Sequence, residues 1–239
     1  MTGKQQKLLR EAGGYLLFLA PAVILFLALE IVPLFLNVGY SLTNWDGISS
    51  KFSFVGLSNY VKLFTDDPRF WTSMVFTIKN SVVVVVFTNL LGLAFALGLS
   101  QSIPLRNFMR ASFYIPKVVG GVILGFVWQF IFSNIFPAIG QMTGWHIFQL
   151  QWLGTPETSF WAMAIVQVWS SAGYMMIIYV AGLSAISNDY IEAAVLDGAS
   201  SLQVLLHVKL PLIMPAITEC LFLSLIWLFV IVLEIRNDE

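Results

Sequence analysis

Residues 75–99 read VFTIKNSVVVVVFTNLLGLAFALGL, a run in which Lys79 is the sole charged side chain. The hydrocarbon core of a bilayer is about 30 Å thick, so a helix that crosses it needs about 20 predominantly apolar residues. The run meets this length, and the long side chain of Lys79 can extend its ammonium group toward an interface. The stretch therefore predicts a transmembrane α-helix.

Comparable stretches recur along the chain. The predicted spans are residues 14–40, 75–99, 112–133, 160–186 and 210–235. Apolar residues make up 58% of the sequence and charged residues 10%, whereas soluble domains have about 45–50% and about 25%. The first span is too long for the apolar part of a signal peptide and lacks a small-residue cleavage site, so we expect it to be retained. We predict one domain over residues 1–239, an all-α integral membrane bundle of about five transmembrane helices.

The distribution of Lys and Arg predicts the orientation of the chain. Basic residues lie before the first span and around the second loop, at Lys4, Lys7, Arg10, Arg106, Arg110 and Lys117. The third loop, residues 134–159, has none. Cytoplasmic loops carry the excess of Lys and Arg, so we expect a cytoplasmic N-terminus and an external C-terminus. The first loop does not fit this distribution, because the predicted topology places its basic residues Lys51, Lys62 and Arg69 outside.

The loop between the fourth and fifth spans, residues 187–211, reads SNDYIEAAVLDGASSLQVLLHVKLP. This pattern predicts two short helices with a hinge. Ser187, Asn188 or Asp189 can cap the first helix, and Ser200 or Ser201 the second. Gly198 permits the left-handed conformation that ends a helix, and Pro211 suits the start of the fifth span.

The composition of this loop suits a docking surface. Small side chains at Ala193 and Ala194 would let another surface approach closely, and Glu192 adds a charge for one pairing. Ile191 and Val195 are four residues apart and share a helix face. On these grounds alone, a loop lying on lipid headgroups is an equal alternative.

The same stretch resembles the EAA loop of permease subunits in binding-protein-dependent ABC importers. That pattern is Glu-Ala-Ala, three residues, Gly, nine residues, an aliphatic residue, one residue and Leu-Pro. It falls here on Glu192, Ala193, Ala194, Gly198, Val208, Leu210 and Pro211, with Val208 in place of the usual Ile. Residues 54–60, 113–116, 179–183 and 197–200 resemble the carbohydrate branch, and in particular the maltose- and glycerol-phosphate-type permeases.

This resemblance implies a multi-pass permease in the cell membrane of a prokaryote, which imports a sugar or related polyol. Its implied partners are an ABC ATPase subunit dimer, a second permease subunit, an external solute-binding protein and membrane lipid. The ATPase would hold the loop through Glu192, Ala193, Ala194, Asp197, Gly198, Val208, Leu210 and Pro211. The sequence has no P-loop, so we expect no enzymatic activity in this chain and ATP hydrolysis on a separate subunit.

The sequence departs from this family in one respect. Relatives of this type have six spans, with a Gly-Gly-Pro loop after the fifth, whereas this sequence ends at Glu239 before such a loop. We therefore expect the chain to be C-terminally incomplete. The alternative function is that of a truncated, non-transporting paralogue or a fragment, which only binds partner subunits. Secondary transport fits the hydropathy but not the EAA spacing, and no span carries the paired carboxylates of a membrane enzyme.

Polar and aromatic residues within the spans are candidates for a translocation pathway. The candidates are Glu219, Gln167, Asn89 and Trp169. Each candidate has an alternative role. Glu219 can be hydrated at the cytoplasmic mouth of the bundle, and Trp169 can pack against other side chains or anchor the helix at the interface. Gln167 and Asn89, like Asn80, can form hydrogen bonds between helices. Prolines and glycines such as Pro116 and Gly120 either line the pathway or are ordinary features of membrane helices.

The sequence indicates no cofactor, metal or nucleic-acid partner. Cys220 is the single cysteine, and His146 and His207 lack a second ligand at metal spacing. No run of basic residues could bind a nucleic-acid backbone.

Overall fold

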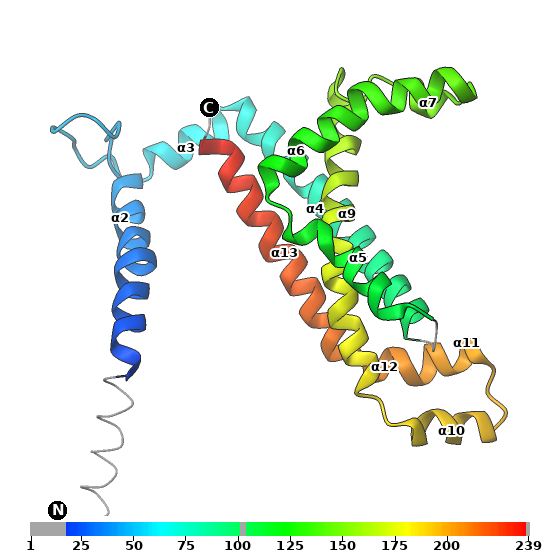
Figure 1. The fold of residues 1–239 in the computed structure, drawn as a ribbon. Helices are drawn as coiled ribbons and strands as arrows, with labels where there is room; N and C mark the ends of the chain where they lie inside the picture. The colour runs from blue at the N-terminus through cyan, green and yellow to red at the C-terminus, as the bar shows by residue number, and fades with distance from the viewer. Residues whose placement is uncertain (1–17, 101–103, 238–239) are drawn as a thin grey trace, which may run out of the picture. The chain divides into compact units, whose positions relative to one another are not determined.

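A computed structural model describes residues 18–100 and 104–237, with the backbone alone for 227–237. Within these residues the chain is helical apart from loops and one isolated β-bridge between Thr43 and Phe54. The all-α membrane fold predicted from the sequence is confirmed (Figure 1). Four helices are long and apolar enough to cross a membrane, namely Phe18–Ser41, Pro68–Leu99, Gly121–Thr143 and Pro156–Ser184. A bent pair, Ser201–Leu212 and Met214–Ile226, makes a fifth if it counts as one span.

The chain divides into two compact units at Met74–Val75, within helix α4 (Pro68–Leu99). In the first unit the helix Phe18–Ser41 contains a π-helical segment, η1 (Leu27–Ile31), followed by α2 (Val32–Ser41). Residues 14–17 of the predicted first span lie outside the described residues. The short α3 (Ser58–Thr65) is held to the end of α2 by Asn59, whose amide donates to the carbonyls of Ser41 and Thr43.

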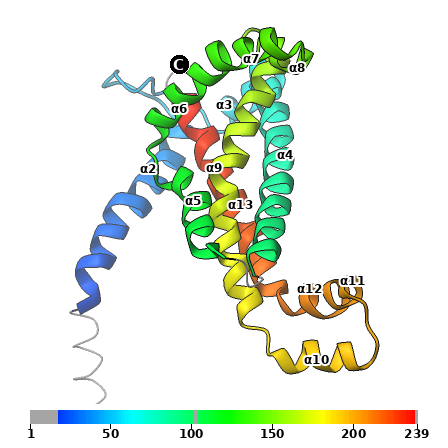
Figure 2. The ribbon, with the colours of Figure 1, turned by 45° about the vertical axis from the view of Figure 1, so that its right-hand side comes forward.

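The second unit is built around α9 (Pro156–Ser184), which packs against α5 (Arg106–Val118) and α13 (Met214–Asn237) (Figures 1 and 2). Glycines make the close approaches. A Cβ added at Gly92 of α4 would lie 2.9 Å from Cβ of Met175, and one added at Gly182 would lie 2.8 Å from Cβ of Ala216. Small residues at such contacts let membrane helices pack closely without a hydrophobic driving force between them.

The predicted third span, residues 112–133, crosses a break in the structure. Helix α5 ends at Val118, and α6 (Gly121–Phe130) begins after two extended residues, Val119 (ψ 129°) and Gly120 (ψ 141°). Adjacent glycines weaken a helix because each costs about 1 kcal/mol relative to Ala. Beyond the break the helix continues through η2 (Ile131–Ile135) and α7 (Phe136–Thr143), so it runs further than the sequence predicts. Most of the expected third loop is helical, with α8 at His146–Gln149.

The predicted fifth span, residues 210–235, contains a bend. The chain turns by 67° at Ile213, between α12 (Leu210–Leu212) and α13. Pro215 has no N–H to donate to the preceding turn, which removes the helical hydrogen bond that would straighten this segment. Leu210 and Pro211 therefore lie in the loop predicted at residues 187–211 and not in α13, the helix that follows.

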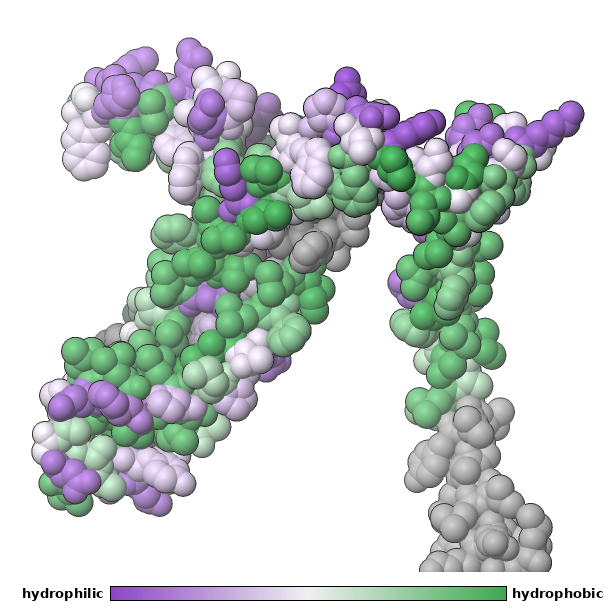
Figure 3. All heavy atoms as spheres, turned by 180° about the vertical axis from the view of Figure 1, so that it is seen from behind, coloured by the Kyte–Doolittle hydropathy of each residue, from purple (hydrophilic) through white to green (hydrophobic). Residues whose placement is uncertain are grey.

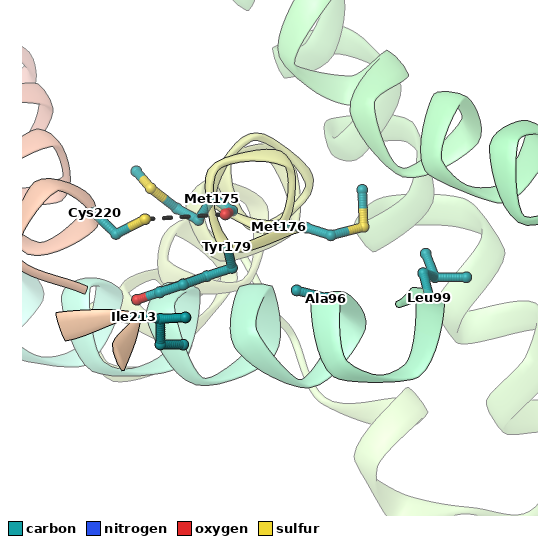
Figure 4. Packing of buried hydrophobic residues seen from close by; sticks show 7 residues of the cluster. All are labelled: Ala96, Leu99, Met175, Met176, Tyr179, Ile213 and Cys220. Carbon is teal, nitrogen blue, oxygen red and sulfur yellow. Dashed lines mark hydrogen bonds between the residues drawn. The ribbon is translucent and has the colours of Figure 1, made fainter. Parts of the chain in front are cut away.

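The largest buried cluster of the second unit joins α4, α9, the bend and α13. Its fully buried members are Ala96, Leu99, Met175, Met176, Tyr179, Ile213 and Cys220 (Figure 4). The outer faces of the long helices carry apolar side chains, as Figure 3 shows, with hydrophilic residues gathered toward the helix ends. Exposed apolar side chains along helices of this length are what a lipid environment requires.

Candidate docking loop and pathway residues

The chain between α9 and α13 forms a helical hairpin. It consists of α10 (Asn188–Leu196), α11 (Ser201–Val204), the π-helical η3 (Leu205–Lys209) and α12. The hairpin projects beyond the ends of the bundle helices (Figures 1 and 2). Ile213 at its exit is 1% exposed and Leu210 packs beside it, so the hairpin is anchored in the buried cluster.

Serine caps begin both helices of the hairpin. The Ser187 hydroxyl accepts the backbone N–H of Asp189 at 3.3 Å and caps α10. Ser200 and Gln203 form a reciprocal capping box on α11, in which the Ser200 N–H donates to Oε1 of Gln203 at 2.8 Å. Of the caps that the sequence allows, the structure thus uses Ser187 and Ser200. Such caps satisfy backbone donors that a short exposed helix would otherwise leave free.

The hinge of the hairpin is Gly198, which has φ +82°. Its N–H donates to the Val195 carbonyl at 3.0 Å, and the Ala199 N–H donates to the Ala194 carbonyl at 3.0 Å. These two bonds form a Schellman motif, which ends α10 and turns the chain toward α11. The left-handed conformation that the sequence predicts at Gly198 is present.

The outer face of α10 exposes a mixed surface. Glu192 and Ala193 are exposed, and Ala194 is half-buried. Of the predicted apolar strip, Val195 is exposed and Ile191 is half-buried. Two further apolar side chains, which sequence reasoning missed, are more than half exposed: Tyr190 at 59% and Leu196 at 87%. They flank the Glu-Ala-Ala stretch, so large apolar residues next to this motif are the signal that could have found them.

The remaining predicted docking residues are spread along the second half of the hairpin. Asp197 is the exposed C-cap residue of α10. Val208 and Leu210 are half-buried and Pro211 is exposed. Leu202 and Leu206 add exposed apolar surface. Exposed residues thus predominate along α10 and recur in α11, η3 and α12.

The polar pathway candidates on α4 and α9 are paired between helices. Nδ2 of Asn80 donates to Oε1 of Gln167 at 3.0 Å. Asn89 is bound on both sides of its amide, because Tyr179 donates to its Oδ1 at 2.7 Å and its Nδ2 donates to Ser224 at 3.0 Å. The interhelical hydrogen bonds predicted as the alternative for these amides are therefore present.

The other two pathway candidates lie elsewhere. Trp169 is 45% exposed and packs edge-on against Trp128, with ring centroids 5.3 Å apart. It also lines a cavity of about 570 Å³ between α4, α5 and α9, whose walls are apolar side chains such as Phe87 and Leu91. Glu219 is exposed on α13. The four candidates thus occupy separate positions and do not form one cluster.

The described residues contain no group of three His, Cys, Asp or Glu side chains that could hold a metal ion.

Basic residues gather near the hairpin. The Arg110 guanidinium donates to the Leu99 carbonyl at 2.6 Å at the end of α4, and Leu99 belongs to the cluster that anchors the hairpin. His207 and Lys209 lie in the last turn of η3. The end of α4, the start of α5 and the hairpin are therefore at one end of the bundle (Figure 2).

Comparison with known proteins identifies similar sequences and folds. Residues 88–235 match the family described as binding-protein-dependent transport system inner membrane component. The probable starch degradation products transport system permease protein AmyD of Thermoanaerobacterium thermosulfurigenes is 42% identical over 93% of this chain and 75% of its own length. The trehalose/maltose transport system permease protein MalF of Thermococcus litoralis is 34% identical over 91% and 74%.

A third relative is the multiple sugar-binding transport system permease protein MsmF of Streptococcus mutans, which is 31% identical over 92% of this chain and 75% of its length. Among solved structures, a bacterial ABC transporter that imports the acidic polysaccharide alginate superposes with a TM-score of 0.77 at 21% identity. The match covers 92% of this chain and 75% of that chain. At this identity, the superposition describes the fold alone.

Proposed function

Because the chain belongs to the family of binding-protein-dependent transport system inner membrane components, we propose that α10 docks it onto the ATPase subunit of a sugar importer. The membrane permease of a sugar ABC importer is the role that its family and its relatives share. ATP hydrolysis takes place on the separate ATPase subunit. Closure of the ATPase dimer displaces α10, and this displacement switches the bundle between inward- and outward-facing states.

The observation that carries this proposal is the surface of α10. The Ser187 cap and the Gly198 turn bind backbone groups at both of its ends, so the helix is preformed. Tyr190, Val195 and Leu196 nevertheless expose apolar area next to Glu192. Exposed apolar residues grouped around one charge are typical of a protein interface. A cleft on the ATPase subunit that receives α10 would bury this surface.

The position of the basic residues supports a cytoplasmic hairpin. Arg106 and Arg110 begin α5, and Arg110 binds the end of α4. Together with His207 and Lys209, they lie at the hairpin end of the second unit. Lys and Arg favour the cytoplasmic side. The cytoplasmic side is where an ATPase subunit has access to ATP. Because four predicted spans precede the hairpin, the N-terminus lies on the same side.

We propose starch-derived α-glucose oligosaccharides as the substrate, on the grounds of 42% identity to a probable permease for starch degradation products. A second permease subunit completes the path, and an external solute-binding protein delivers the sugar. Among the pathway candidates, Gln167 is half-buried, and its amide NH2 group, which donates to no described residue, is available to a sugar hydroxyl. Trp169 offers an exposed aromatic face, and Glu219 contributes a carboxylate on α13.

Uptake into proteoliposomes tests the proposal. The chain is reconstituted with its ATPase, second permease subunit and solute-binding protein, and radiolabelled maltotriose is added outside. Uptake is expected only with ATP on the hairpin side. An excess of unlabelled mannitol should not compete with the uptake of labelled maltotriose. Uptake that proceeds equally without ATP, or without the ATPase subunit, would refute it.

A further inference from the structure

A chain of hydrogen bonds joins α4, α9 and α13 inside the bundle. The Tyr179 hydroxyl donates to Oδ1 of Asn89 at 2.7 Å, and Nδ2 of Asn89 donates to the Ser224 hydroxyl at 3.0 Å. The Ser224 hydroxyl donates onward to the Cys220 carbonyl at 2.6 Å. The first two bonds link residues 90 and 135 positions apart in the sequence, so they connect different helices, whereas the third lies within α13.

The side chains of this chain of bonds are buried and their polar atoms are satisfied. Tyr179 is 1% exposed, Ser224 is 6% exposed and Asn89 is 9% exposed. Asn89 uses its second amide hydrogen on the Val85 carbonyl at 2.8 Å. Breaking one bond would leave a buried donor or acceptor unpaired, where neither lipid nor water can replace it. Neighbouring Thr88 differs, since its buried hydroxyl has no hydrogen-bond partner among the described residues.

Two of these three helices, α9 and α13, are connected directly to the docking hairpin. Helix α9 enters it and α13 leaves it. Tyr179 lies in the same buried cluster as Ile213, the residue at the hairpin exit (Figure 4). Nearer the hairpin, α9 and α13 approach closely at Gly182 and Ala216. The hydrogen bonds join α4 to both of these helices, close to its contact with α9 at Gly92.

We propose that Tyr179, Asn89 and Ser224 are positioning residues that make α4, α9 and α13 move as one body when α10 is displaced. Membrane helices gain no hydrophobic energy from one another, so hydrogen bonds and close contacts decide whether they slide. Without this chain of bonds, a displacement of the hairpin is absorbed by sliding between α9, α13 and α4. The inference rests on the proposed function, because the displacement comes from the docked ATPase.

The test is the number of ATP molecules hydrolysed per maltotriose imported, measured with the complete importer in proteoliposomes. Tyr179→Phe removes one hydroxyl, Ser224→Ala removes another, and the double variant removes both. Each single variant should raise the ratio about threefold, the change that corresponds to one interhelical hydrogen bond in a membrane. The double variant should be no worse than about one single variant, because either change interrupts the same chain.

Thr88→Val is the matched control, since it removes an equally buried hydroxyl that no residue in the described part of the chain binds. It should leave the ratio unchanged. Amounts of assembled complex and unfolding midpoints are compared for all variants, because a purely structural role would alter these and not the ratio. If the parent importer couples ATP to maltotriose uptake and both single variants keep its ratio, the positioning role is overturned. If the parent shows no such coupling, the proposed function fails with it.

Discussion

A methyl group added to Gly173 of α9 would overlap the backbone carbonyl of Phe113 on α5. The two helices therefore approach at a point where no side chain fits. Gly173→Ala should force them apart at a cost of about 1–3 kcal/mol, as in an overpacked core. The unfolding midpoint of the purified protein in detergent measures this loss. Gly125→Ala is the control, because a Cβ there meets nothing within 4 Å, and its midpoint should stay level or rise. Equal midpoints for both variants would be incompatible with this contact.

The hinge at Gly198 gives a second prediction. With φ at +82°, a β-branched residue is strained, and about 1–2 kcal/mol is the cost of this conformation for an L-residue. Gly198→Val should therefore distort the turn between α10 and α11 and weaken retention of the ATPase subunit, whereas Gly198→Asn should be tolerated better. Co-purification of the ATPase measures both. Indistinguishable retention by the two variants would argue against a hinge that holds α10 in place.

The predicted topology can be checked with two equally exposed positions. Met142 and Leu196 are each 87% exposed, the first at the end of α7 and the second at the end of α10. In intact cells that lack the ATPase subunit, a membrane-impermeant thiol reagent should label Met142→Cys but not Leu196→Cys. After permeabilisation it should label both. Cys220 is 0% exposed and should not contribute. The opposite pattern in intact cells would invert the topology.

The turn after α2 should respond to acid. The backbone N–H groups of Ser49 and Ile48 donate to the Asp46 carboxylate, and these bonds lower the pKa of Asp46 from its ordinary value of 3.8. Because the folded-state pKa of Asp46 is lowered, its carboxylate stabilises the turn at pH values above the ordinary pKa. This stabilisation is lost as the pH falls through the lowered pKa of the folded state. The indole of Trp45 donates to the Ser49 carbonyl, so its fluorescence should change in that range. Asp46→Asn should abolish the change, and a change that persists would assign it to another group.

The sequence predicts most of the second unit because its signals are local. Apolar run length places the long helices, and Ser187, Ser200 and Gly198 mark the caps and hinge of the hairpin. The breaks are harder to predict. Pro116 lies inside α5, whereas the chain breaks after Val118. Composition alone does not distinguish a proline that its neighbours tolerate from a glycine pair that ends a helix.

Interhelical partners are the part that spacing does not predict. Asn89 is recognisable as a polar residue in an apolar run, and a bond to another helix follows from its cost in lipid. Its partners Tyr179 and Ser224 are 90 and 135 residues away, and nothing in their local sequence distinguishes them from other polar residues in the spans. Only the packing of α4, α9 and α13 brings these residues together.

Docking through α10 is tested most directly by one pair of substitutions, measured as the amount of ATPase subunit that co-purifies with the permease. Ala193 is exposed on α10 and Ala181 is exposed on α9, so Ala193→Leu and Ala181→Leu make the same change inside and outside the docking surface. Neither should alter insertion or expression. A larger side chain in a close-fitting cleft costs about 1–3 kcal/mol, which predicts at least a fivefold loss of bound ATPase for Ala193→Leu and none for Ala181→Leu. Equal retention by the two variants, with ATP-driven uptake intact, would contradict docking through α10.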